Sequence, residues 1–593
     1  MPVMTKRQLG NENLLSQSET HVSESIQLLE KLVSSGRYLE ARQLTTKLKG
    51  SQDVNQVRVD QLLALSLSKS GSPESALEHL EPVYRQHADD PETAGIMGGI
   101  YKDLFKKHQD SKYAILSRDT YLKNFQATKN FYPGINAATM SAIAGRAAQG
   151  REIASQVIAL LNPQSTDFWE LATLGEAHLL TKNRTQSVEF FIKARQLAGT
   201  DWGKVTSVYN QLWLLNHYAP VPKEIQKVFS PPAVVAFVGH MIDHPERTVP
   251  RFPASIESNV KEAIKGAIKT LNASIGYCSL ACGGDILFAE AMEEAGGEVQ
   301  LFLPFAKDDF ANISVRFAGE HWVERFERLS NKFPVTYVTE EKYGGFDDLF
   351  SFQSRIIFGS AVLRSASYHQ EPTLLTVLSD TDLRRKEGGT RDTVRMWPFA
   401  DKYINVNPDQ FVAPVTVAAP VSSGFPTIEK KIARPVLYLV LADLSQLPVL
   451  EKERVNKVVQ SKLSDELIPY KAFEQQPDSI FISFDAETSA LDFVQLIMGQ
   501  QPKGDHPIKL SLHAGPVYLE DDGQKNAKMV EGENITLIQE MNRLSPRGGI
   551  VASDHFASLL ALNAKKFKLE YAGMLQGSSA SKARGVYNVT IKI

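Results

Sequence analysis

Apolar residues recur at helical spacing from about Ser23 to Tyr218, and short polar turns separate the runs. The run from Ile26 to Val33, for example, is broken at Gly36. A turn about every 15–17 residues, with small residues on one helix facing large ones on the next, is what stacked antiparallel helix pairs need. The pattern predicts an all-α helical solenoid over 23–228 after a disordered N-terminus, 1–22. A non-repetitive helical bundle is the alternative.

The pattern of apolar and polar residues changes after Pro231. An apolar, β-branched run from Val234 to Val238 follows and ends in Gly239-His240. Such a run predicts a buried parallel strand that leads into a loop. The elements expected after it are helices 255–271 and 286–295 and strands 299–303 and 374–378. Alternating strands and helices, with glycines at strand exits, predict a doubly wound, Rossmann-like α/β domain over 229–402.

Periodicity is then lost and prolines recur, so we expect a partly extended linker over 403–434. A new hydrophobic strand begins at Val436, and helices and strands follow it in an α+β order. The expected elements are strand 436–442, helix 449–463, strands 480–484 and 508–518, and helix 536–543. This order predicts a third domain over 435–593 with a mainly antiparallel sheet.

Composition limits the setting of the protein. The 593 residues carry a net charge of −3 and the basic residues are scattered, so there is no electrostatic case for nucleic acid or an anionic membrane as a partner. The N-terminus lacks the apolar core of a signal peptide, and no apolar run approaches the roughly 18 residues of a membrane span. We therefore expect a cytoplasmic protein. Cys278 and Cys282 are interpreted as small buried side chains rather than as a redox or metal pair.

Two glycine pairs stand at expected strand-to-helix turns: Gly283-Gly284, and Gly388-Gly389 followed by Thr390. Glycine allows a tight turn, and the first N–H groups of the next helix then point at an anion that the helix dipole favours. Glycine pairs also occur at such turns for structural reasons alone. Two of them at one sheet edge nevertheless predict a nucleotide-sized crevice.

Several rare strings in the first 400 residues occur in one order that resembles a known family. In the helical region they are Leu65 to Gly71, Glu92-Thr93, Tyr101 to Leu104 and Gly134 to Met140. In the next region they are Gly239 to Asp243, Arg251 to Pro253, Gly276-Tyr277, Cys282 to Phe288, Leu303 to Phe305 and Ser314-Val315. Over 25–400 the chain resembles the tetratricopeptide (TPR) "TRAFs-binding" proteins, which include apoptosis signal-regulating kinases and many bacterial proteins. The resemblance implies a bacterial scaffold whose TPR-like repeats bind a protein partner.

The segment 230–400 in turn resembles the SLOG superfamily of Rossmann-like nucleotide binders, which is related to nucleoside deoxyribosyltransferases and LOG-type phosphoribohydrolases. The resemblance implies a nucleotide ligand near Gly239, His240 and Asp243. It also places Asp285 as a ribose-contacting acid and Glu290 as a carboxylate that acts on a glycosidic bond. From the residues alone, the alternative is that Asp285 is a helix N-cap and Glu290 a solvated helix residue.

Two arginines after the first expected strand complete this candidate nucleotide site. Arg247 and Arg251 are candidate phosphate clamps, because a guanidinium group binds phosphate in a bidentate manner. The alternative is that both are surface arginines of a proline-rich loop.

In the tail, Asp443, Asp478 and the strings His513 to Val517 and Gly549 to Ser553 resemble class III adenylate and guanylate cyclases. The resemblance implies that Asp443 and Asp478 hold two Mg²⁺ or Mn²⁺ ions, so that a ribose 3′-hydroxyl can attack an α-phosphate. It also implies a homodimer, because sites of this family form at a dimer interface. From the residues alone, Asp443 is equally a strand-end or turn aspartate.

The tail departs from the cyclase pattern at several positions. Leu444-Ser445-Gln446 replaces the Gly-Phe after the first aspartate, and Pro477 replaces the glycine before the second. An ungapped alignment puts Thr536 and Glu540 where the transition-state Asn and Arg belong, and Arg543 serves only with a shifted helix register. An acid where a cation should stabilise phosphate charge is unfavourable. We therefore interpret the tail as a degenerate cyclase homology domain.

Three functions follow from these observations. The first is an intracellular signalling scaffold in which the repeats bind a protein, the middle domain senses a nucleotide or nucleotide-derived molecule, and the tail dimerises or responds. The second is an active cyclase that forms a cyclic nucleotide from ATP or GTP with Mg²⁺ or Mn²⁺. The third is a nucleotide N-glycosidic-bond hydrolase in the middle domain that uses Glu290. The sequence leaves open whether the chain is an enzyme.

Overall fold

The computed structural model describes residues 24–592 with internal gaps. The gaps are 52–54, 248, 346–347, 380–393, 413–435, 466, 503–506, 521–527, 530–531, 564 and 576–582. The chain divides into two compact units, one formed by 1–231 with the short stretch 572–575 and the other by 232–571 with 576–593. The predicted turn at Gly388, Gly389 and Thr390 lies outside the described residues, as does the N-terminus 1–22.

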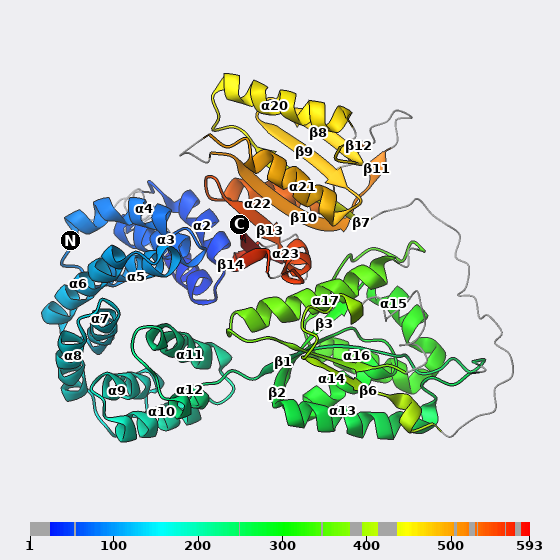
Figure 1. Cartoon of the computed structure of the whole chain (residues 1–593), viewed down its shortest axis with the longest axis horizontal. Coiled ribbons are helices and arrows are strands. Elements are labelled where there is room, and N and C mark those ends of the chain that lie inside the picture. Colours follow the sequence, from blue (N-terminus) through cyan, green and yellow to red (C-terminus); the bar gives the residue numbers. More distant parts are fainter. Residues whose placement is uncertain are drawn as a thin grey trace, which may run out of the picture. The chain divides into compact units, whose positions relative to one another are not determined.

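The first unit is a succession of helices that winds in an arc (Figure 1). After a helix over 24–34 come α2 (Tyr38–Leu48), α3 (Gln56–Lys69), α4 (Pro73–Gln86), α5 (Pro91–His108), α6 (Ser111–Thr128), α7 (Phe131–Ile143), α8 (Ala147–Leu160), α9 (Phe168–Leu180), α10 (Arg184–Ala198), α11 (Trp202–Asn216) and α12 (Lys223–Val228). Polar side chains cap the beginning of several of them. Asn55 accepts a hydrogen bond from the Arg58 N–H, and Asp90 accepts one from the Thr93 N–H, which satisfies donors at helix ends.

Glycines allow neighbouring helices of the first unit to approach closely. A Cβ atom on Gly134 of α7 would lie 2.8 Å from the ring of Phe125 of α6, and one on Gly175 of α9 would lie 2.6 Å from the ring of Phe191 of α10. Both rings are buried. Paired helices with small residues facing large ones were the basis of the solenoid prediction, which is confirmed.

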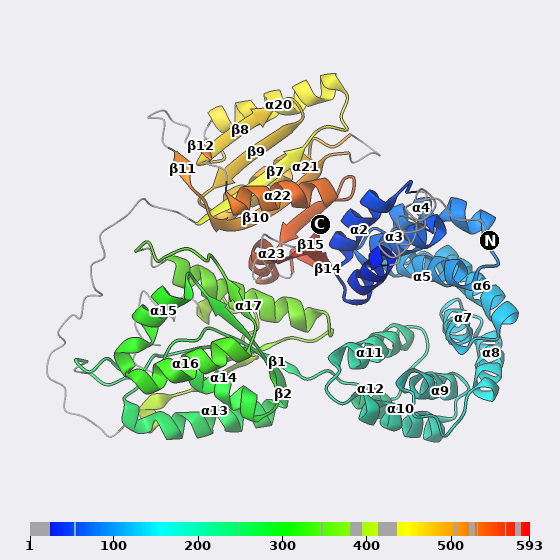
Figure 2. The ribbon, with the colours of Figure 1, turned by 180° about the vertical axis from the view of Figure 1, so that it is seen from behind.

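Helix α11 lies on the inner side of this arc, as Figures 1 and 2 both show. Lys102 Nζ of α5 donates a hydrogen bond to Gln211 Oε1 of α11 at 2.8 Å. Just beyond α11, the Tyr218 hydroxyl donates to Gln109 Oε1 at 2.9 Å, and the rings of Tyr218 and Phe105 are 5.7 Å apart. The curvature of the solenoid thus brings together polar side chains that are more than 100 residues apart in the sequence.

The second unit contains a six-stranded parallel sheet with the strand order β4-β3-β2-β1-β5-β6. Its strands are β1 (Ala233–Gly239), β2 (Ala273–Cys278), β3 (Glu298–Leu303), β4 (Val335–Tyr337), β5 (Thr373–Val377) and β6 (Tyr403–Val406). Its helices are α13 (Glu257–Leu271), α14 (Gly284–Glu294), α15 (Lys307–Ser314), α16 (Glu320–Lys332) and α17 (Asp348–Ala366), with 3₁₀ turns Ala254–Ile256, Arg316–Ala318 and Pro408–Gln410. The predicted alternation of strands and helices is confirmed.

Strand β6 lies inside the stretch that was expected to be a linker. It pairs in parallel with β5, with Tyr403 opposite Leu374. Asn405 reinforces the pairing, because its Oδ1 accepts the N–H of Leu378 at 3.1 Å and the hydroxyl of Thr376 at 2.8 Å. A four-residue edge strand held partly by a side-chain amide has too few positions to show a periodic pattern, and this explains why the sequence did not reveal it.

The second unit, together with residues 572–575 at the end of β14, also contains a seven-stranded sheet with the order β14-β15-β13-β10-β7-β9-β8. Its strands are β7 (Val436–Asp443), β8 (Ala472–Gln476), β9 (Ser479–Phe484), β10 (Lys509–Pro516), β13 (Ile550–Ser553), β14 (Phe567–Leu575) and β15 (Arg584–Ile591), beside a small ribbon of β11 (Leu519–Glu520) and β12 (Lys528–Met529). Its helices are α20 (Val449–Ser464), α21 (Glu487–Met498), α22 (Glu533–Leu544) and α23 (Asp554–Ala561). Neighbouring strands pair antiparallel at β7–β10, β7–β9, β8–β9 and β13–β15, and β10 pairs in parallel with β13. The sheet is therefore mainly antiparallel, as the sequence predicted.

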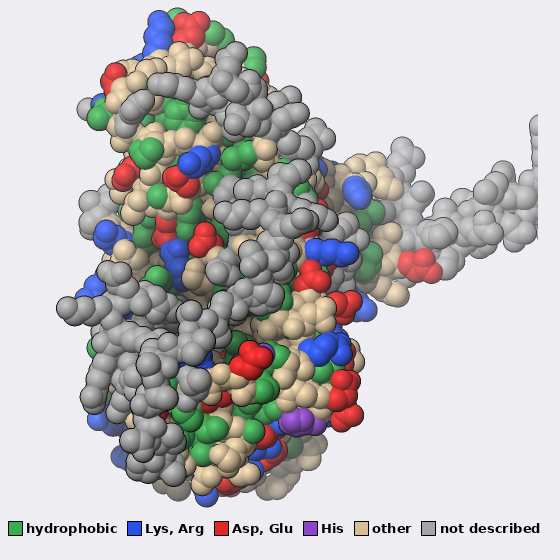
Figure 3. Space-filling model, turned by 90° about the vertical axis from the view of Figure 1, so that its right-hand side faces the viewer, with side chains coloured by type: hydrophobic (Ala, Val, Ile, Leu, Met, Phe, Trp, Pro, Cys, Tyr) green, Lys and Arg blue, Asp and Glu red, His purple; other side chains and the backbone are tan. Residues whose placement is uncertain are grey.

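Charged side chains on the described surface are mixed in sign. Figure 3 shows Lys and Arg side chains interspersed with Asp and Glu on the face that it draws. Within the described ranges, no helix is both long enough and apolar enough to cross a membrane.

Candidate functional site

The exits of β1 and β5 are neighbours in the middle of the parallel sheet. From β1 the strand order runs outward through β2, β3 and β4, and the chain then returns through α17 to β5 on the other side of β1. The direction of winding reverses between β1 and β5, so the loops that follow these two strands diverge. In open α/β sheets, ligands bind in the crevice at such a point. Six residues predicted from the sequence lie at or beside it: Gly239, His240, Asp243, Gly283, Gly284 and Asp285.

The glycines at this point are required by close backbone packing. A Cβ atom on Gly284 would lie 3.1 Å from the Cα of Gly239, and one on Gly283, whose φ is +100°, would lie 2.6 Å from the backbone nitrogen of Ile242. The Gly284 N–H donates to the His240 carbonyl at 2.9 Å. The amide expected to face an anion is therefore engaged within the chain, and anion contact by these glycines stays a prediction.

His240 joins the exits of β1 and β5. Its backbone N–H donates to the Val377 carbonyl at 2.9 Å, and its Nε2 accepts the N–H of Ser379 at 3.1 Å. A backbone N–H can only donate, so Nε2 is the acceptor of this hydrogen bond. His240 and Ser379 are both buried. The ring is therefore held in one orientation at the reversal point.

Asp285 is a buried carboxylic acid directly beneath this turn. Its Oδ2 accepts the N–H of Ala281 at 3.2 Å, and its exposed fraction is 7%. Burial raises the pKa of Asp285 to about 7, and the backbone N–H groups of Ala281 and Gly239 oppose that rise only in part. Gly283 occupies the N-cap position of α14, so the alternative of an N-cap role for Asp285 is wrong. The carboxyl can donate or accept a proton near neutral pH.

Asp243 organises the loop after β1. Its Oδ2 accepts the backbone N–H groups of Arg251 at 2.8 Å and Phe252 at 2.9 Å. Its Oδ1 lies 3.2 Å from Nε of Arg247, whose side chain is 29% exposed. Asp243 thus places one partly exposed guanidinium group in the loop after β1. Phosphate binding by Arg247 and Arg251 stays a prediction.

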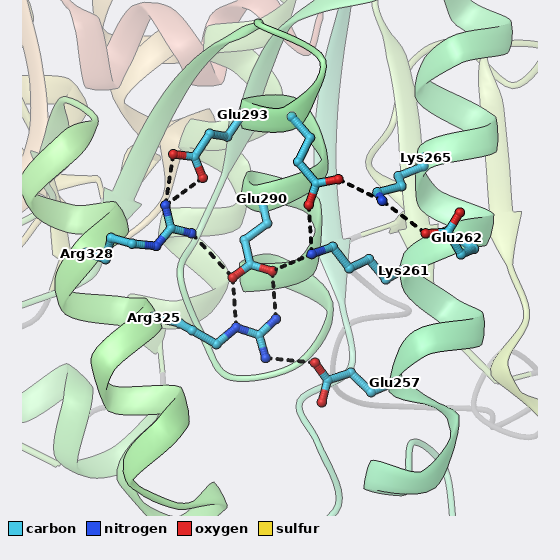
Figure 4. A network of polar contacts seen from close by, with 9 residues as sticks. Glu257, Lys261, Glu262, Lys265, Glu290, Glu293, Arg325 and Arg328 are labelled. Atoms are coloured by element: carbon cyan, nitrogen blue, oxygen red, sulfur yellow. Dashed lines mark hydrogen bonds and ion pairs between the residues drawn. The ribbon is translucent and has the colours of Figure 1, made fainter.

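Glu290 lies at the centre of a network of ion pairs between α13, α14 and α16 (Figure 4). Its two carboxylate oxygens each lie 2.8 Å from the guanidinium group of Arg325, and Oε2 lies 3.0 Å from Lys261 Nζ. Burial alone would raise the pKa of Glu290, but the hydrogen bonds and charges of these two cations lower it. The network continues to Glu257, Lys265, Glu293, Glu294, Arg328 and Lys332.

These contacts exclude one of the two interpretations of Glu290, that of a solvated helix residue. Glu290 is not solvated, because its side chain is 9% exposed and is paired with Lys261 of α13 and Arg325 of α16. Catalysis by Glu290 stays a prediction. The sequence contained a signal for the network: acids recur at 290, 293 and 294 of α14, and cations recur one turn apart in α13 and α16.

The two aspartates of the tail are brought together at one end of neighbouring strands. Asp443 ends β7, and the N–H of Leu444 donates to the Asp478 carbonyl at 2.8 Å. Each carboxylate has a lysine partner: Lys509 Nζ lies 3.4 Å from Asp443 Oδ2, and Lys452 Nζ lies 2.5 Å from Asp478 Oδ1. Burial raises the pKa of Asp443, but hydrogen bonds from Ser445 and the charge of Lys509 lower it below its ordinary value. The lysines were missed from the sequence.

A site for two divalent cations needs several hard anionic ligands that are not already neutralised. Across the described part of the chain, no group of three or more His, Cys, Asp or Glu side chains is arranged to hold a metal ion. Asp443 and Asp478, each beside a lysine, fit ammonium groups better than Mg²⁺ or Mn²⁺. On α22, Thr536 and Arg543 are exposed and Glu540 is half-buried. A catalytic role for Arg543 stays a prediction.

His513, in a string that resembles the cyclases, is a core residue. Its Nδ1 is 2.8 Å from the Ser553 hydroxyl, and its Nε2 is 3.0 Å from Asn534 Oδ1. Burial, together with the charges of His555 and Arg584, lowers the pKa of His513 to about 3. The ring is therefore neutral at physiological pH and joins β10, β13 and α22 through hydrogen bonds.

The two cysteines, Cys278 and Cys282, are both buried in the core of the parallel sheet. Burial raises the pKa of both thiols, that of Cys282 to about 12. A thiol of this kind is a poor nucleophile and metal ligand, because both roles need the thiolate. The interpretation of small buried side chains is confirmed.

One cavity in the first unit was missed from the sequence. It has a volume of about 380 Å³ and is lined by α3, α5, α6 and α7. Its lining includes Gly95, Gly99, Lys102 and Lys106, which follow one another at helical spacing on a single face of α5. This spacing is a local sequence signal for the cavity. It can be recognised only once the helices that pack around α5 are known.

A family model agrees with a repeat architecture over part of the first unit. A family model described as "Tetratricopeptide Repeats-Sensor" matches residues 37–141. No curated protein matches the chain. Among solved structures, the TPR protein TTC0263 of Thermus thermophilus is 17% identical over 32% of this chain and 98% of that chain, with a TM-score of 0.27.

Two cyclases are also similar to part of the chain. The guanylyl cyclase Cya2 is 14% identical over 26% of this chain and 92% of that chain, with a TM-score of 0.20. The adenylyl cyclase CyaB of P. aeruginosa is 13% identical over 27% of this chain and 96% of that chain, with a TM-score of 0.21. At such identities and TM-scores these structures carry no argument about function. The family match assigns TPR repeats to the first unit, and repeats of this kind generally mediate protein–protein interaction.

Proposed function

We propose that this protein is a signalling scaffold that binds a protein partner through its TPR repeats and a nucleotide, or a nucleotide-derived molecule, at the parallel sheet of its second unit. On this proposal, the sheet belongs to a Rossmann-like, SLOG-type domain. The observation that carries the nucleotide part is the hydrogen bond from the Ser379 N–H to His240 Nε2, which fixes both strand exits at the reversal point. A rigid crevice at that point is the usual ligand position of such sheets.

The chemistry of the neighbouring residues supports a nucleotide ligand. Arg247, held by Asp243, supplies a guanidinium group that matches a phosphate. Asp285, with its pKa raised to about 7, can donate a hydrogen bond when protonated and accept one when ionised, as recognition of a ribose hydroxyl requires. Glu290 is already paired with Arg325 and Lys261, so binding without glycosidic-bond cleavage is the simpler assignment.

The TPR repeats provide the protein-binding part of the proposal. Stacked helix pairs present an extended inner surface that takes peptides or helices. For the tail, we propose a cyclase homology domain without cyclase activity that mediates dimerisation. Lys452 and Lys509 support this assignment, because each pairs with one of the two aspartates that the cyclase resemblance assigns to divalent cations.

The experiment that tests the nucleotide proposal is a thermal-shift panel on the full chain with adenine and guanine nucleotides. A ligand at 100 times its Kd stabilises the folded protein by about 2.7 kcal/mol if it binds only that form. We expect Arg247→Gln to raise the Kd of the nucleotide roughly tenfold, because a charge-assisted hydrogen bond is lost. The thermal shift at a fixed nucleotide concentration should therefore be smaller in the variant. Lys269→Gln removes a positive charge from the exposed last turn of α13 and serves as the matched control.

Two results would contradict the proposal. The first is a panel in which no nucleotide shifts the unfolding transition, and the second is an equal shift in Arg247→Gln and the wild type. Formation of a cyclic product from ATP or GTP with Mn²⁺ would replace the scaffold assignment of the tail with an enzymatic one.

A further inference from the structure

The cavity of the first unit combines the size of a small-molecule site with three lysines, Lys69, Lys102 and Lys106, in its lining. Its volume of about 380 Å³ lies in the range of small-molecule sites, which is roughly 300–1,000 Å³. It lies between α5 on one side and α3, α6 and α7 on the others. The nucleotide site proposed above lies in the second unit and does not use this cavity.

Most charged groups that line the cavity are paired with opposite charges. Asp103 is shared by two lysines, with Lys69 Nζ at 3.0 Å and Lys106 Nζ at 3.3 Å. Glu92 is paired with Arg58 at 2.9 Å. One carboxylate between two ammonium groups still leaves a net positive charge at this end of the cavity.

Lys102 is the exception. Its Nζ donates to two neutral amide oxygens, Asn136 Oδ1 at 3.1 Å and Gln211 Oε1 at 2.8 Å. Among the described residues, no carboxylate oxygen lies within ion-pair distance of it. Two acids act on Lys102 from beyond that distance, Glu176 and Asp103, and their charges favour its protonated form. Gln211 Nε2 donates to Glu176 Oε1 at 2.8 Å. Burial lowers the pKa of Lys102 to about 7, and the charge of Lys106 adds to this effect.

The same face of α5 leaves room beside these lysines. A Cβ atom on Gly95 would meet only Asn124 Nδ2, at 3.9 Å, and one on Gly99 would meet only the Tyr121 hydroxyl, at 3.5 Å. Glycine lowers the stability of a helix interior by about 1 kcal/mol relative to alanine, so two open glycine positions one turn apart are unfavourable unless the space is used. Tyr132, which is 56% exposed, stands at the edge of the space.

We propose that this cavity binds a small molecule with an anionic group, a phosphate or a carboxylate, that pairs with Lys102 and Lys106 while its body lies over Gly95 and Gly99. An anion beside Lys102 would supply the partner that its two amide contacts do not. It would also offset the excess positive charge that remains around Asp103. The amide side chains of Asn124 and Asn136 provide donors and acceptors for the neutral part of the ligand.

Hydrogen exchange on the full chain tests the proposal, with pyrophosphate as the phosphate probe and citrate as the carboxylate probe. A probe at ten times its Kd suppresses local opening about tenfold, so peptides from α5 and α7 should exchange about tenfold more slowly. Lys102→Met should abolish this protection. Lys112→Met, which removes a 61% exposed lysine at the start of α6, is the control and should keep it.

A second variant covers the case in which Lys102→Met does not fold. Gly95→Leu fills the cavity from a position where the new side chain meets open space, and it should also abolish protection by either probe. Protection by only one probe identifies the anionic group. The proposal is overturned if neither probe slows exchange in α5 and α7, or if protection is equal in both variants and the wild type. Protection confined to peptides of α14 also overturns it, because that result places the anion at the nucleotide site of the second unit.

Discussion

The buried carboxyl of Asp285 makes a prediction about pH that can be worked out from the structure. The pKa of this group is about 7 in the folded protein, whereas in an unfolded chain it is near 3.9. The folded state therefore binds the proton more tightly than the unfolded state. The resulting stability is fully present below about pH 4 and is lost as the pH rises towards 7.

The size of the effect follows from the two pKa values. A rise in the pKa from near 4 to about 7 corresponds to a loss of stability on the order of 4 kcal/mol at a pH above both values. Roughly 2–3 kcal/mol of this loss falls between pH 5 and pH 8. Asp285→Asn removes the ionisation but keeps an oxygen that can accept the Ala281 N–H. The stability of the variant relative to the wild type should thus increase by roughly 2–3 kcal/mol as the pH rises from 5 to 8.

The assay is hydrogen exchange of peptides from β1 and α14, corrected for intrinsic exchange rates at each pH, because it reports on this sheet rather than on the whole chain. Glu324→Gln is the matched control, since it removes one negative charge from an exposed position on α16. Equal pH dependence in Asp285→Asn and the wild type would refute the reasoning. A wild type whose opening free energy does not decrease between pH 5 and pH 8 would refute it as well.

Three further predictions concern packing and ionisation elsewhere. Glu290→Gln breaks a largely buried ion network and should lower the free energy of unfolding by about 3 kcal/mol in urea titrations, so a loss below about 0.5 kcal/mol would contradict the structural role. Gly175→Ala should destabilise the first unit by about 1 kcal/mol, because the new Cβ atom would lie 2.6 Å from a buried ring. Gly95→Ala should stabilise the same unit by up to about 1 kcal/mol, because alanine favours a helix over glycine. Far-UV circular dichroism during denaturation measures both changes. Cys278 and Cys282 should resist alkylation by iodoacetamide at pH 8 in the native protein, and labelling as fast as in denaturant would be the contrary result.

Much of the architecture could be predicted because its causes are local. The helix pairs follow from apolar periodicity and from glycines that face aromatic rings, as Gly175 faces Phe191. Strand β1 follows from a continuous apolar run, since a strand buried on both faces excludes polar residues. The glycines at the strand exit were also found, but for a different physical reason. They were expected to cradle an anion, and they allow Gly239 and Gly284 to pack against each other.

The rest depends on contacts between residues far apart in the chain. Glu290 meets Arg325 across 35 residues, and Lys102 meets Gln211 across 109 residues. Neither partner can be identified without the fold, because several helices carry polar or charged residues that would serve equally well. The same holds for Lys509, which approaches Asp443 only because β10 and β7 pair antiparallel with these two residues opposite each other.

Electrostatic compensation distinguishes the candidate sites from one another. Several acids were candidate ligand or metal residues from the sequence, and the chain supplies cations to most of them: Arg325 and Lys261 to Glu290, Lys509 to Asp443, and Lys452 to Asp478. A compensated charge has little to gain from a ligand, because binding must first displace its partner. Asp285 and Lys102 differ, since neither has an opposite charge within ion-pair distance in the described part of the chain and burial shifts the pKa of each towards neutrality. Buried groups kept in this state destabilise the fold unless something binds them, so these two residues, one in each unit, are where ligands should be sought first.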